Sequence, residues 1–134
     1  MRVLVTGSRL FANSLVISRA LHLAQLDLDD DGQVTVVHGG ARGADSIAGR
    51  LAEVYGWTVE VHRADWDRHG KAAGHRRNAE MVRLGAGVLL AFYAVGALNR
   101  GTSGCVALAL AAGIPVRPHD ETGPLLRIPG SVTR

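Results

Sequence analysis

The sequence predicts a single α/β domain in which helices cover both faces of a mostly parallel central sheet of about five strands, a three-layer α/β/α arrangement. Short apolar runs typical of buried strands alternate with helical patterns along the 134 residues. Aromatic residues make up only 4% of the chain, so the core must consist of Val, Leu, Ile and Ala, as in layered α/β proteins. Parallel neighbours need crossover connections, which the intervening helices supply.

Each expected element follows from a local pattern. In chain order they are a strand at 2–6, a helix at 14–26, a loop at 27–32, a strand at 34–37, a helix at 44–55, a strand at 57–62, a polar segment at 63–73, a helix at 75–84, a strand at 88–92, a loop at 93–100, a helix at 102–112 and a short edge strand at 114–116. In the first helix we expect the inner side to carry Leu15, Ile17, Leu21 and Leu26.

Length and composition restrict the class of protein. A chain of this size fits one domain, which we place at 1–118, followed by a Pro- and Gly-rich tail at 119–134 that packs on it. One cysteine, Cys105, excludes an intrachain disulfide and favours a reducing compartment. The N-terminus reads directly into a strand without a signal-peptide pattern, and no apolar run is long enough to span a bilayer. We expect a cytoplasmic protein without a membrane partner, folding as a homodimer or higher homo-oligomer.

The positive charge is carried almost entirely by arginine. The formal charge of +3 includes fourteen arginines and one lysine, Lys71. Arginine suits bidentate recognition of phosphate or carboxylate. The competing interpretation is that arginine simply replaces surface lysine, so only arginines beside glycine-rich turns are read as functional.

A glycine-rich turn, His38 to Asp45, joins the second strand to the following helix. Its glycines Gly39, Gly40 and Gly43 bracket Arg42 and would let backbone N–H groups approach an anion at the helix start. The turn matches neither GxGxxG nor GxxxxGKS/T. A merely tight strand-to-helix turn is the alternative, and Asp45 either caps the helix or holds a ligand hydroxyl.

Two further polar turns follow the first and fourth strands. They are Gly7-Ser8-Arg9 and Arg100-Gly101-Thr102-Ser103-Gly104, where Thr102 or Ser103 would cap a helix or donate a hydroxyl to phosphate. Ligands of parallel sheets collect beyond the carboxyl ends of the strands, so the three turns are expected to share one site.

The segment 65–78 is too polar for a core element and suggests a lid or a ligand-facing loop. A surface ion pair with Glu80 is one explanation of Arg76 and a ligand contact is the other, whereas Arg77 and Asn78 lack such a local explanation. The histidines at 62, 69 and 75 do not have metal-ligand spacing, so we predict no metal and no required cofactor. Cys105 lies in an apolar helix and is assigned to core packing. The candidate ligand-binding residues are Gly7, Ser8, Arg9, Gly39, Gly40, Arg42, Gly43, Ala44, Asp45, Lys71, Arg77, Asn78, Arg100, Gly101, Thr102 and Ser103.

Four strings occur in a specific order: VLVTGSR, VVHGGARGADSIA, ADWDRHGKAAGHRRNAEMV and RGT...AGIPV. Together they resemble the YspA/cpYpsA-related SLOG family over about residues 1–118. The resemblance implies a Rossmann-like fold and a nucleotide or nucleotide-derived ligand, such as an ADP-ribose derivative. That ligand would meet residues 7–9, 39–45 and 100–103. Relatives in the wider group include lonely-guy phosphoribohydrolases, molybdenum-cofactor carriers and the DNA-processing protein DprA.

The lonely-guy enzymes carry a PGGxGTxxE motif whose glutamate takes part in breaking an N-glycosidic bond. The corresponding stretch here, 99–105, has Cys105 in place of that glutamate, and Leu10-Phe11 alter the usual GSR-aromatic start. Three hypotheses follow. The first is a binding or sensing module in which Arg42 or Arg100 holds phosphate and Asp45 holds ribose. The second is an N-glycosidic hydrolase using Asp45, Asp65 or Glu80. The third is DprA-like binding of single-stranded nucleic acid, which needs a contiguous basic face rather than scattered arginines.

Overall fold

The computed structural model describes residues 1–28 and 32–130 and contains one sheet with the strand order β3-β2-β1-β4-β5-β6. The strands are β1 (Arg2–Gly7), β2 (Thr35–His38), β3 (Thr58–Val61), β4 (Val88–Phe92), β5 (Val116–Asp120) and β6 (Gly123–Pro124). Every neighbouring pair is parallel except β5 and β6. The expected three-layer α/β/α fold is therefore confirmed, with one short antiparallel strand added at an edge.

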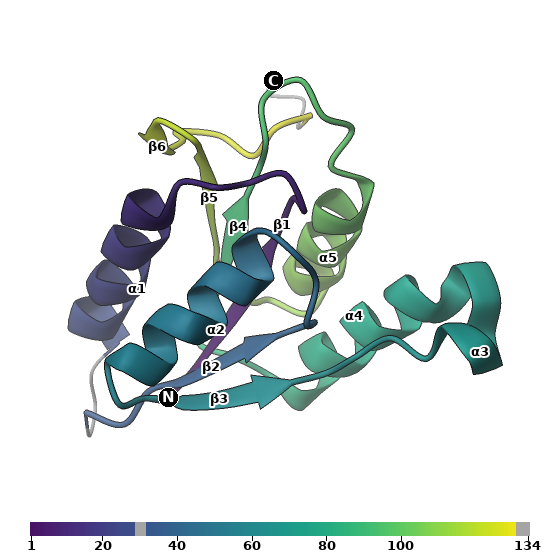
Figure 1. The fold of residues 1–134 in the computed structure, drawn as a ribbon, viewed down its shortest axis with the longest axis horizontal. Coiled ribbons are helices and arrows are strands. Elements are labelled where there is room, and N and C mark those ends of the chain that lie inside the picture. The colour runs from purple at the N-terminus through teal and green to yellow at the C-terminus, as the bar shows by residue number, and fades with distance from the viewer. Residues whose placement is uncertain (29–31, 131–134) are drawn as a thin grey trace.

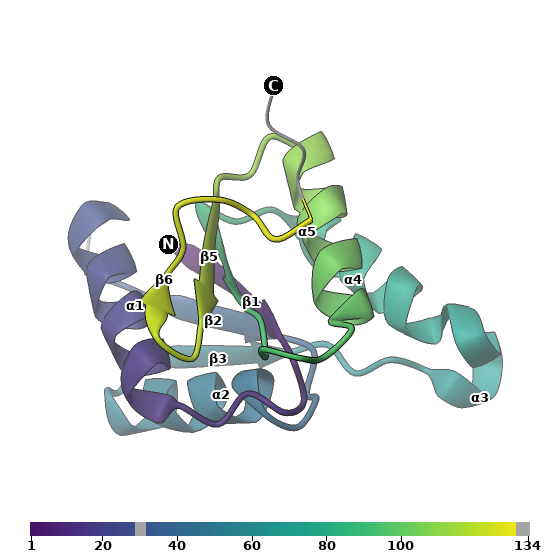
Figure 2. The same ribbon diagram turned by 90° about the horizontal axis from the view of Figure 1, so that it is seen from above.

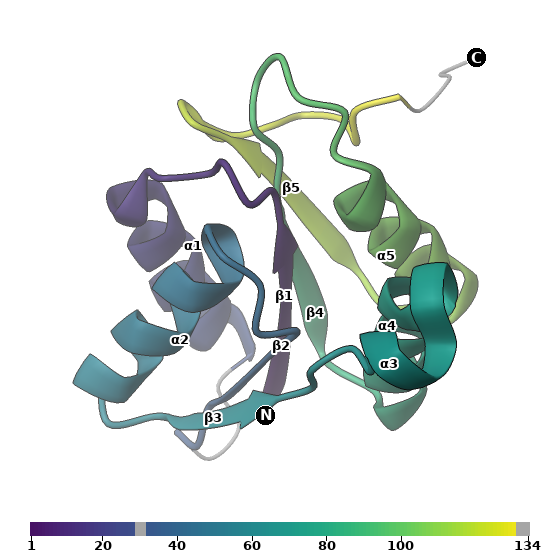
Figure 3. The same ribbon diagram turned by 45° about the vertical axis from the view of Figure 1, so that its right-hand side comes forward.

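In the described part of the chain, two helices cover each face of the sheet. On one face lie α1 (Ser14–Leu28) and α2 (Ala44–Val54), and on the other lie α4 (Ala73–Leu84) and α5 (Arg100–Ala111) (Figures 1 and 3). A short helix α3 (Trp66–His69) and a 3-10 turn (Gly70–Ala72) precede α4. In both perpendicular views α3 projects beyond the sheet at the far end of α4 (Figures 1 and 2).

The core is divided into two clusters by the sheet. Side chains of a strand alternate between its faces, so Val3 and Val5 of β1 join the cluster beneath α1 and α2, whereas Leu4 joins the cluster beneath α4 and α5. All five residues of β4 are fully buried, as expected for a central parallel strand. This double burial makes the middle of the sheet a rigid base for the loops at its carboxyl edge.

The inner face of α1 differs in part from the prediction. Ile17 and Leu21 are buried, but Leu15 and Leu26 are 69% and 74% exposed. At about 100° per residue, both exposed leucines lie nearly opposite Ile17 on the helix. Their expected place is taken by small residues, Ala20 and Ala24, which let the helix approach the sheet closely.

Other boundaries also change. The polar segment 63–73 contains α3, and α5 begins at Arg100 rather than at residue 102. The strand predicted at 114–116 instead runs from Val116 to Asp120, and pairing with β6 removes it from the edge of the sheet. In the loop predicted at 27–32, residues 27 and 28 end α1, and 29–31 lie outside the described residues, as do 131–134 of the predicted tail. Within the described ranges, no helix has the length and apolar character needed to cross a membrane.

Candidate functional site

A cavity lies at the carboxyl edge of the sheet, where the chain changes direction. From β1 the sheet grows through β2 and β3 on one side and through β4 and β5 on the other, so the loops leaving β1 and β4 diverge to opposite faces (Figure 3). Such a switch point opens the crevice in which doubly wound sheets bind ligands. The cavity has a volume of about 530 Å³, and segments that follow β1, β2, β3 and β4 all line it.

Most of the predicted site residues meet at this cavity, but six do not. The predicted residues that line it are Gly7, Ser8, Arg9, Asp45, Lys71, Arg77, Asn78, Arg100, Gly101 and Thr102. Those outside its lining are Gly39, Gly40, Arg42, Gly43, Ala44 and Ser103. The lining also includes Ala41, Trp66, Gly74, His75, Asn99 and Gly104, which lie in segments expected near the ligand but were not candidate contacts. Thr6 and Met81 line it without having been predicted at all.

The glycines of the 38–45 turn serve the packing of the chain itself. A Cβ on Gly39 would lie 2.3 Å from Nη1 of Arg77, and one on Gly43 would lie 2.4 Å from the carbonyl oxygen of Ser8. Arg63 takes the corresponding space beside Gly40. The turn predicted to cradle a phosphate is thus already filled by two arginines and the backbone after β1.

Asp45 holds this turn together from inside. Its Oδ2 accepts hydrogen bonds from the N–H groups of Gly39 (3.0 Å) and Ala41 (3.3 Å). Its other oxygen, Oδ1, is buried and has no hydrogen-bond partner among the described residues. The helix N-cap is Gly43, without a side-chain capping bond, so capping by Asp45 is wrong. The carboxylate instead bonds upstream N–H groups and leaves one oxygen for another donor.

Burial shifts the pKa values of two neighbouring groups in opposite directions. Burial raises the pKa of Asp45 to about 6, although the N–H groups of Ala41 and Gly39 and the charges of Arg77 and Arg9 lower it. Burial lowers the pKa of His38 to about 4, with further lowering by Arg63 and Arg77. At neutral pH Asp45 is mostly ionised and His38 is neutral, with Nδ1 accepting the N–H of Gly40.

The start of α5 forms a second wall. Its N-cap is Asn99, in the left-handed conformation (φ 54°), and no side chain of the described residues caps the helix. Neither Thr102, which is buried, nor Ser103, which is exposed, acts as the cap. Among the described residues, no acceptor is found for the N–H groups of residues 100, 101 and 102. Open space lies where Gly101 and Gly104 would carry a Cβ, so a ligand can approach this helix start closely.

Positive charge dominates the described lining. Four permanent cations, Arg9, Lys71, Arg77 and Arg100, accompany one carboxylate, Asp45. Arg77 is engaged, because it donates to the carbonyl of Gly39 (2.7 Å) and to Oδ1 of Asn78 (2.7 Å). The side chains of the other three cations make no hydrogen bond or ion pair with a described residue.

The remaining candidates lie elsewhere. Asp65 is exposed and caps α3 by accepting the N–H of Arg68 (3.1 Å), and Glu80 pairs with Arg83 rather than with Arg76. Neither carboxylate lines the cavity. Cys105 is fully buried in the core, and burial raises the pKa of its thiol to about 11. Among the described residues, no three His, Cys, Asp or Glu side chains are grouped as a metal site requires.

The strand order and the crevice between β1 and β4 define a doubly wound α/β protein of the Rossmann-like class. The sequence model of the YspA, cpYpsA-related SLOG family matches residues 1–69, just over half of the chain. The chain belongs to this family. It is also 51% identical over 122 residues to the Gene 61 protein of Mycobacterium phage D29, an alignment that covers 86% of this chain and 93% of that protein. No solved structure matches the chain significantly.

Proposed function

We propose that this protein binds a phosphorylated, ribose-containing ligand, a nucleotide or a nucleotide derivative, in the cavity at the carboxyl edge of the sheet. The observation that carries the proposal is the carboxylate of Asp45, which lines the cavity. One of its oxygens is bonded to the turn, and the other is buried without a hydrogen-bond partner in the described part of the chain. A buried oxygen without a donor is costly. A ribose hydroxyl supplies that donor.

The phosphate belongs at the opposite wall. The first N–H groups of α5, which have no acceptor in the part of the chain that the structure describes, favour an anion there, as does the positive end of the helix dipole. Gly101 and Gly104 leave the backbone accessible. Arg100 from the same turn and Lys71 from the wall after β3 add charge. Of the two arginines expected to hold phosphate, the proposal keeps Arg100 and drops Arg42, which is outside the cavity lining.

Titration calorimetry with adenosine 5′-monophosphate (AMP), ADP-ribose and NAD tests the proposal, with adenosine as the ligand that lacks phosphate. Phosphorylated ligands are expected to bind and to raise the melting temperature through linkage, and adenosine to bind more weakly. If no member of a broad nucleotide panel gives a heat of binding or raises the melting temperature, the proposal is contradicted.

Matched variants locate the site. Asp45→Asn removes a charged acceptor, for which a loss of about 1.5–3 kcal/mol is typical, or roughly 10- to 150-fold in affinity. Glu53→Gln removes the same charge from an exposed position of the same helix and is expected to leave affinity unchanged. For the phosphate, Arg100→Gln is paired with Arg50→Gln, an exposed arginine of α2. Equal effects within either pair would count against the assignment.

N-glycosidic hydrolysis is the second candidate, because Asp45 combines a place in the cavity wall with a pKa of about 6. A carboxyl group in that state can exchange a proton near neutral pH. Incubation with nucleoside monophosphates, followed by chromatography, measures release of the free base. Release by the wild type that is lost in Asp45→Asn supports hydrolysis, and no release from any monophosphate refutes it for those substrates.

A further inference from the structure

Trp66 exposes a large aromatic surface on the wall of the cavity. It is the first residue of α3, its exposed fraction is 53%, and it lines the cavity together with Lys71 and His75 from the same stretch of chain. An indole that is half exposed on a cavity wall contributes little apolar burial to the core of the fold. The proposed function, with its ribose contact at Asp45 and its phosphate contact at the start of α5, gives this aromatic surface no role.

Local contacts hold the indole in place. Asp65 caps α3 and so fixes the turn that begins with Trp66. A Cβ on Gly74 would lie 3.6 Å from Cη2 of Trp66, so the six-membered ring rests on the first turn of α4 with no side chain between them. The indole is therefore supported by α4, and Trp66 also lines the cavity.

The spacing between Trp66 and the start of α5 suits one nucleoside. Gly74, which contacts the indole, precedes Asn78 by four residues, a rise of about 6 Å along α4. The side-chain amide of Asn78 donates to the carbonyl of Gly101 (3.4 Å) in the first turn of α5. Asn78 thus links the helix that supports the indole to the helix start that would hold phosphate, with about one helical turn between them.

We propose that Trp66 stacks on the aromatic base of a 5′-mononucleotide whose phosphate lies at the start of α5 and whose ribose meets Asp45. This inference rests on the proposed function, which accounts for the phosphate and the ribose, and adds that the rest of the ligand is an aromatic base. Stacking on a single aromatic face tolerates any base. The site accordingly requires a base while discriminating weakly among the four common ones.

Comparison of AMP with ribose 5-phosphate tests the proposal by calorimetry. The wild type is expected to bind AMP more tightly. Trp66→Leu is expected to weaken AMP about 5- to 150-fold, as typical for loss of one stacked base, and to leave ribose 5-phosphate unchanged. Trp66→Phe keeps a ring and is expected to retain most of the affinity. Because Trp66 is half exposed, a melting curve of each variant should show an intact fold.

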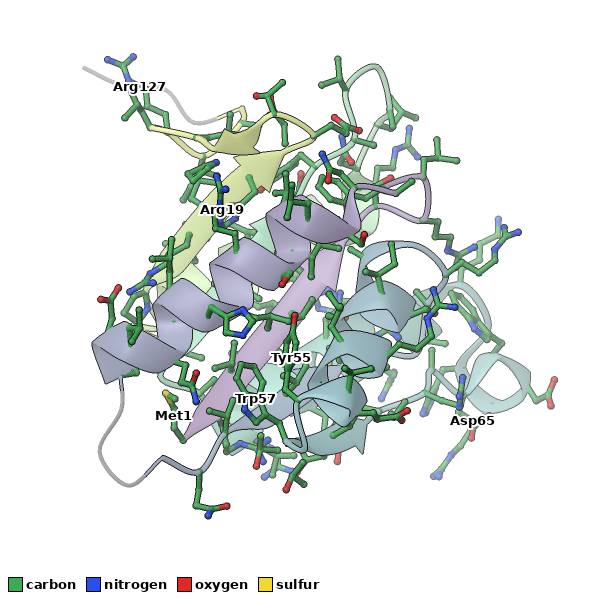
Figure 4. The ribbon with its side chains drawn as sticks, turned by 60° about the vertical axis from the view of Figure 1, so that its left-hand side comes forward. Met1, Arg19, Tyr55, Trp57, Asp65 and Arg127 are labelled. Atoms are coloured by element: carbon green, nitrogen blue, oxygen red, sulfur yellow. The ribbon has the colours of Figure 1, made fainter. Side chains whose placement is uncertain are left out.

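Trp57 provides the matched control. It lies beside Tyr55 and His22 at the start of β3, on the α1 side, whereas α3 and Asp65 follow the other end of that strand (Figure 4). Trp57→Phe is expected to leave AMP affinity unchanged and makes Trp66 the remaining tryptophan. AMP should then quench the fluorescence of Trp66, and ribose 5-phosphate should not.

The outcomes separate this inference from the proposed function. If AMP and ribose 5-phosphate bind equally well, or if Trp66→Leu leaves AMP affinity unchanged, stacking is overturned while the phosphate and ribose site stands. An equal loss for both ligands also overturns stacking, because it indicates a general structural effect. If neither ligand binds the wild type, the stacking inference fails, and the proposed function is then decided by the wider panel that includes ADP-ribose and NAD.

Discussion

The guanidinium group of Arg77 occupies the space in which a side chain at Gly39 would lie. Nη1 of Arg77 donates to the carbonyl of Gly39 at 2.7 Å, and a Cβ on that glycine would come within 2.3 Å of the same nitrogen. The glycine-rich turn and the arginine 38 residues later are therefore parts of one structural unit. Arg77 also lowers the pKa of Asp45, which links the unit to the cavity.

A double-mutant cycle tests this relationship. Gly39→Ala should lower the free energy of unfolding by about 1–3 kcal/mol, because the new methyl group displaces Arg77. In an Arg77→Ala background the same change should cost little, since the space is then empty. Urea denaturation of the four proteins measures the coupling, expected to be at least ~1 kcal/mol. Additive effects would show that the two residues do not share this space.

Gly43 and Gly104 should respond in opposite ways to alanine. Gly43 has φ 77°, and its Cβ would meet the carbonyl oxygens of Ser8 and Arg9, so Gly43→Ala should cost at least ~2 kcal/mol of stability. Gly104 lies inside α5 with open space around it, so Gly104→Ala should stabilise the free protein by roughly 0.5–1 kcal/mol. Thermal denaturation of both variants and the wild type shows whether each substitution lowers or raises stability.

The buried Asp45 and His38 should oppose each other in the pH dependence of stability. The folded pKa of Asp45, about 6, lies above its ordinary value of 3.8, so the native state holds the proton longer and loses stability as pH rises from 4 to 6. The folded pKa of His38, about 4, lies below 6.5, so its contribution is present above pH 6.5 and is lost as pH falls toward 4. In the wild type these two slopes partly cancel.

Asp45→Asn removes one of the two opposing contributions to the pH dependence of stability. Relative to the wild type, the variant should become more stable as pH rises from 4 to 6, by up to about 3 kcal/mol, while losing affinity for nucleotides. His38→Asn, which keeps an acceptor near Gly40, should show the reverse trend. Urea denaturation at intervals from pH 4 to pH 8 measures both differences. A difference between Asp45→Asn and the wild type that stays constant with pH would refute the shifted carboxyl group.

Asn99 should be replaceable only at a cost. Its left-handed backbone starts α5, and its side chain bonds both the N–H and the carbonyl of Ala94 and the carbonyl of Ala97. Asn99→Ala removes these bonds and places a Cβ in an unfavourable conformation, with an expected loss of about 2–4 kcal/mol. Asn99→Gly restores backbone freedom and should recover part of that loss. Chemical denaturation ranks the three proteins, and equal stability of the Ala and Gly variants would exclude the conformational contribution.

The strands and most helices could be predicted because their signals are local. Residues 88–92, for example, are apolar throughout. A short run of this kind between helical segments is typical of a parallel strand that is buried on both faces, as β4 is. The short helix α3 was missed because its residues are polar and number only four. Asp65, as a capping residue three positions before Arg68, was the available signal.

The candidate site could be located from the sequence but not detailed. Loops after parallel strands must meet at one edge, so the turns at 7–9, 38–45 and 100–103 were expected together. Which of their residues face the cavity was not predictable, because a glycine admits either a ligand or another part of the chain. The contribution of Trp66, Gly74 and Gly104 depends on how α4 packs beside α5.

The sequence alone determined that this chain forms a parallel α/β sheet with glycine-rich turns at one edge, because hydrophobic period and turn chemistry are properties of neighbouring residues. Only the tertiary structure decided that Arg77 fills the space beside Gly39, that one oxygen of Asp45 has no partner within residues 1–28 and 32–130, and that the open helix start is that of α5. These are matters of long-range packing and burial. They determine where the cavity and its charged groups lie, and they cannot be read from the pattern of neighbouring residues.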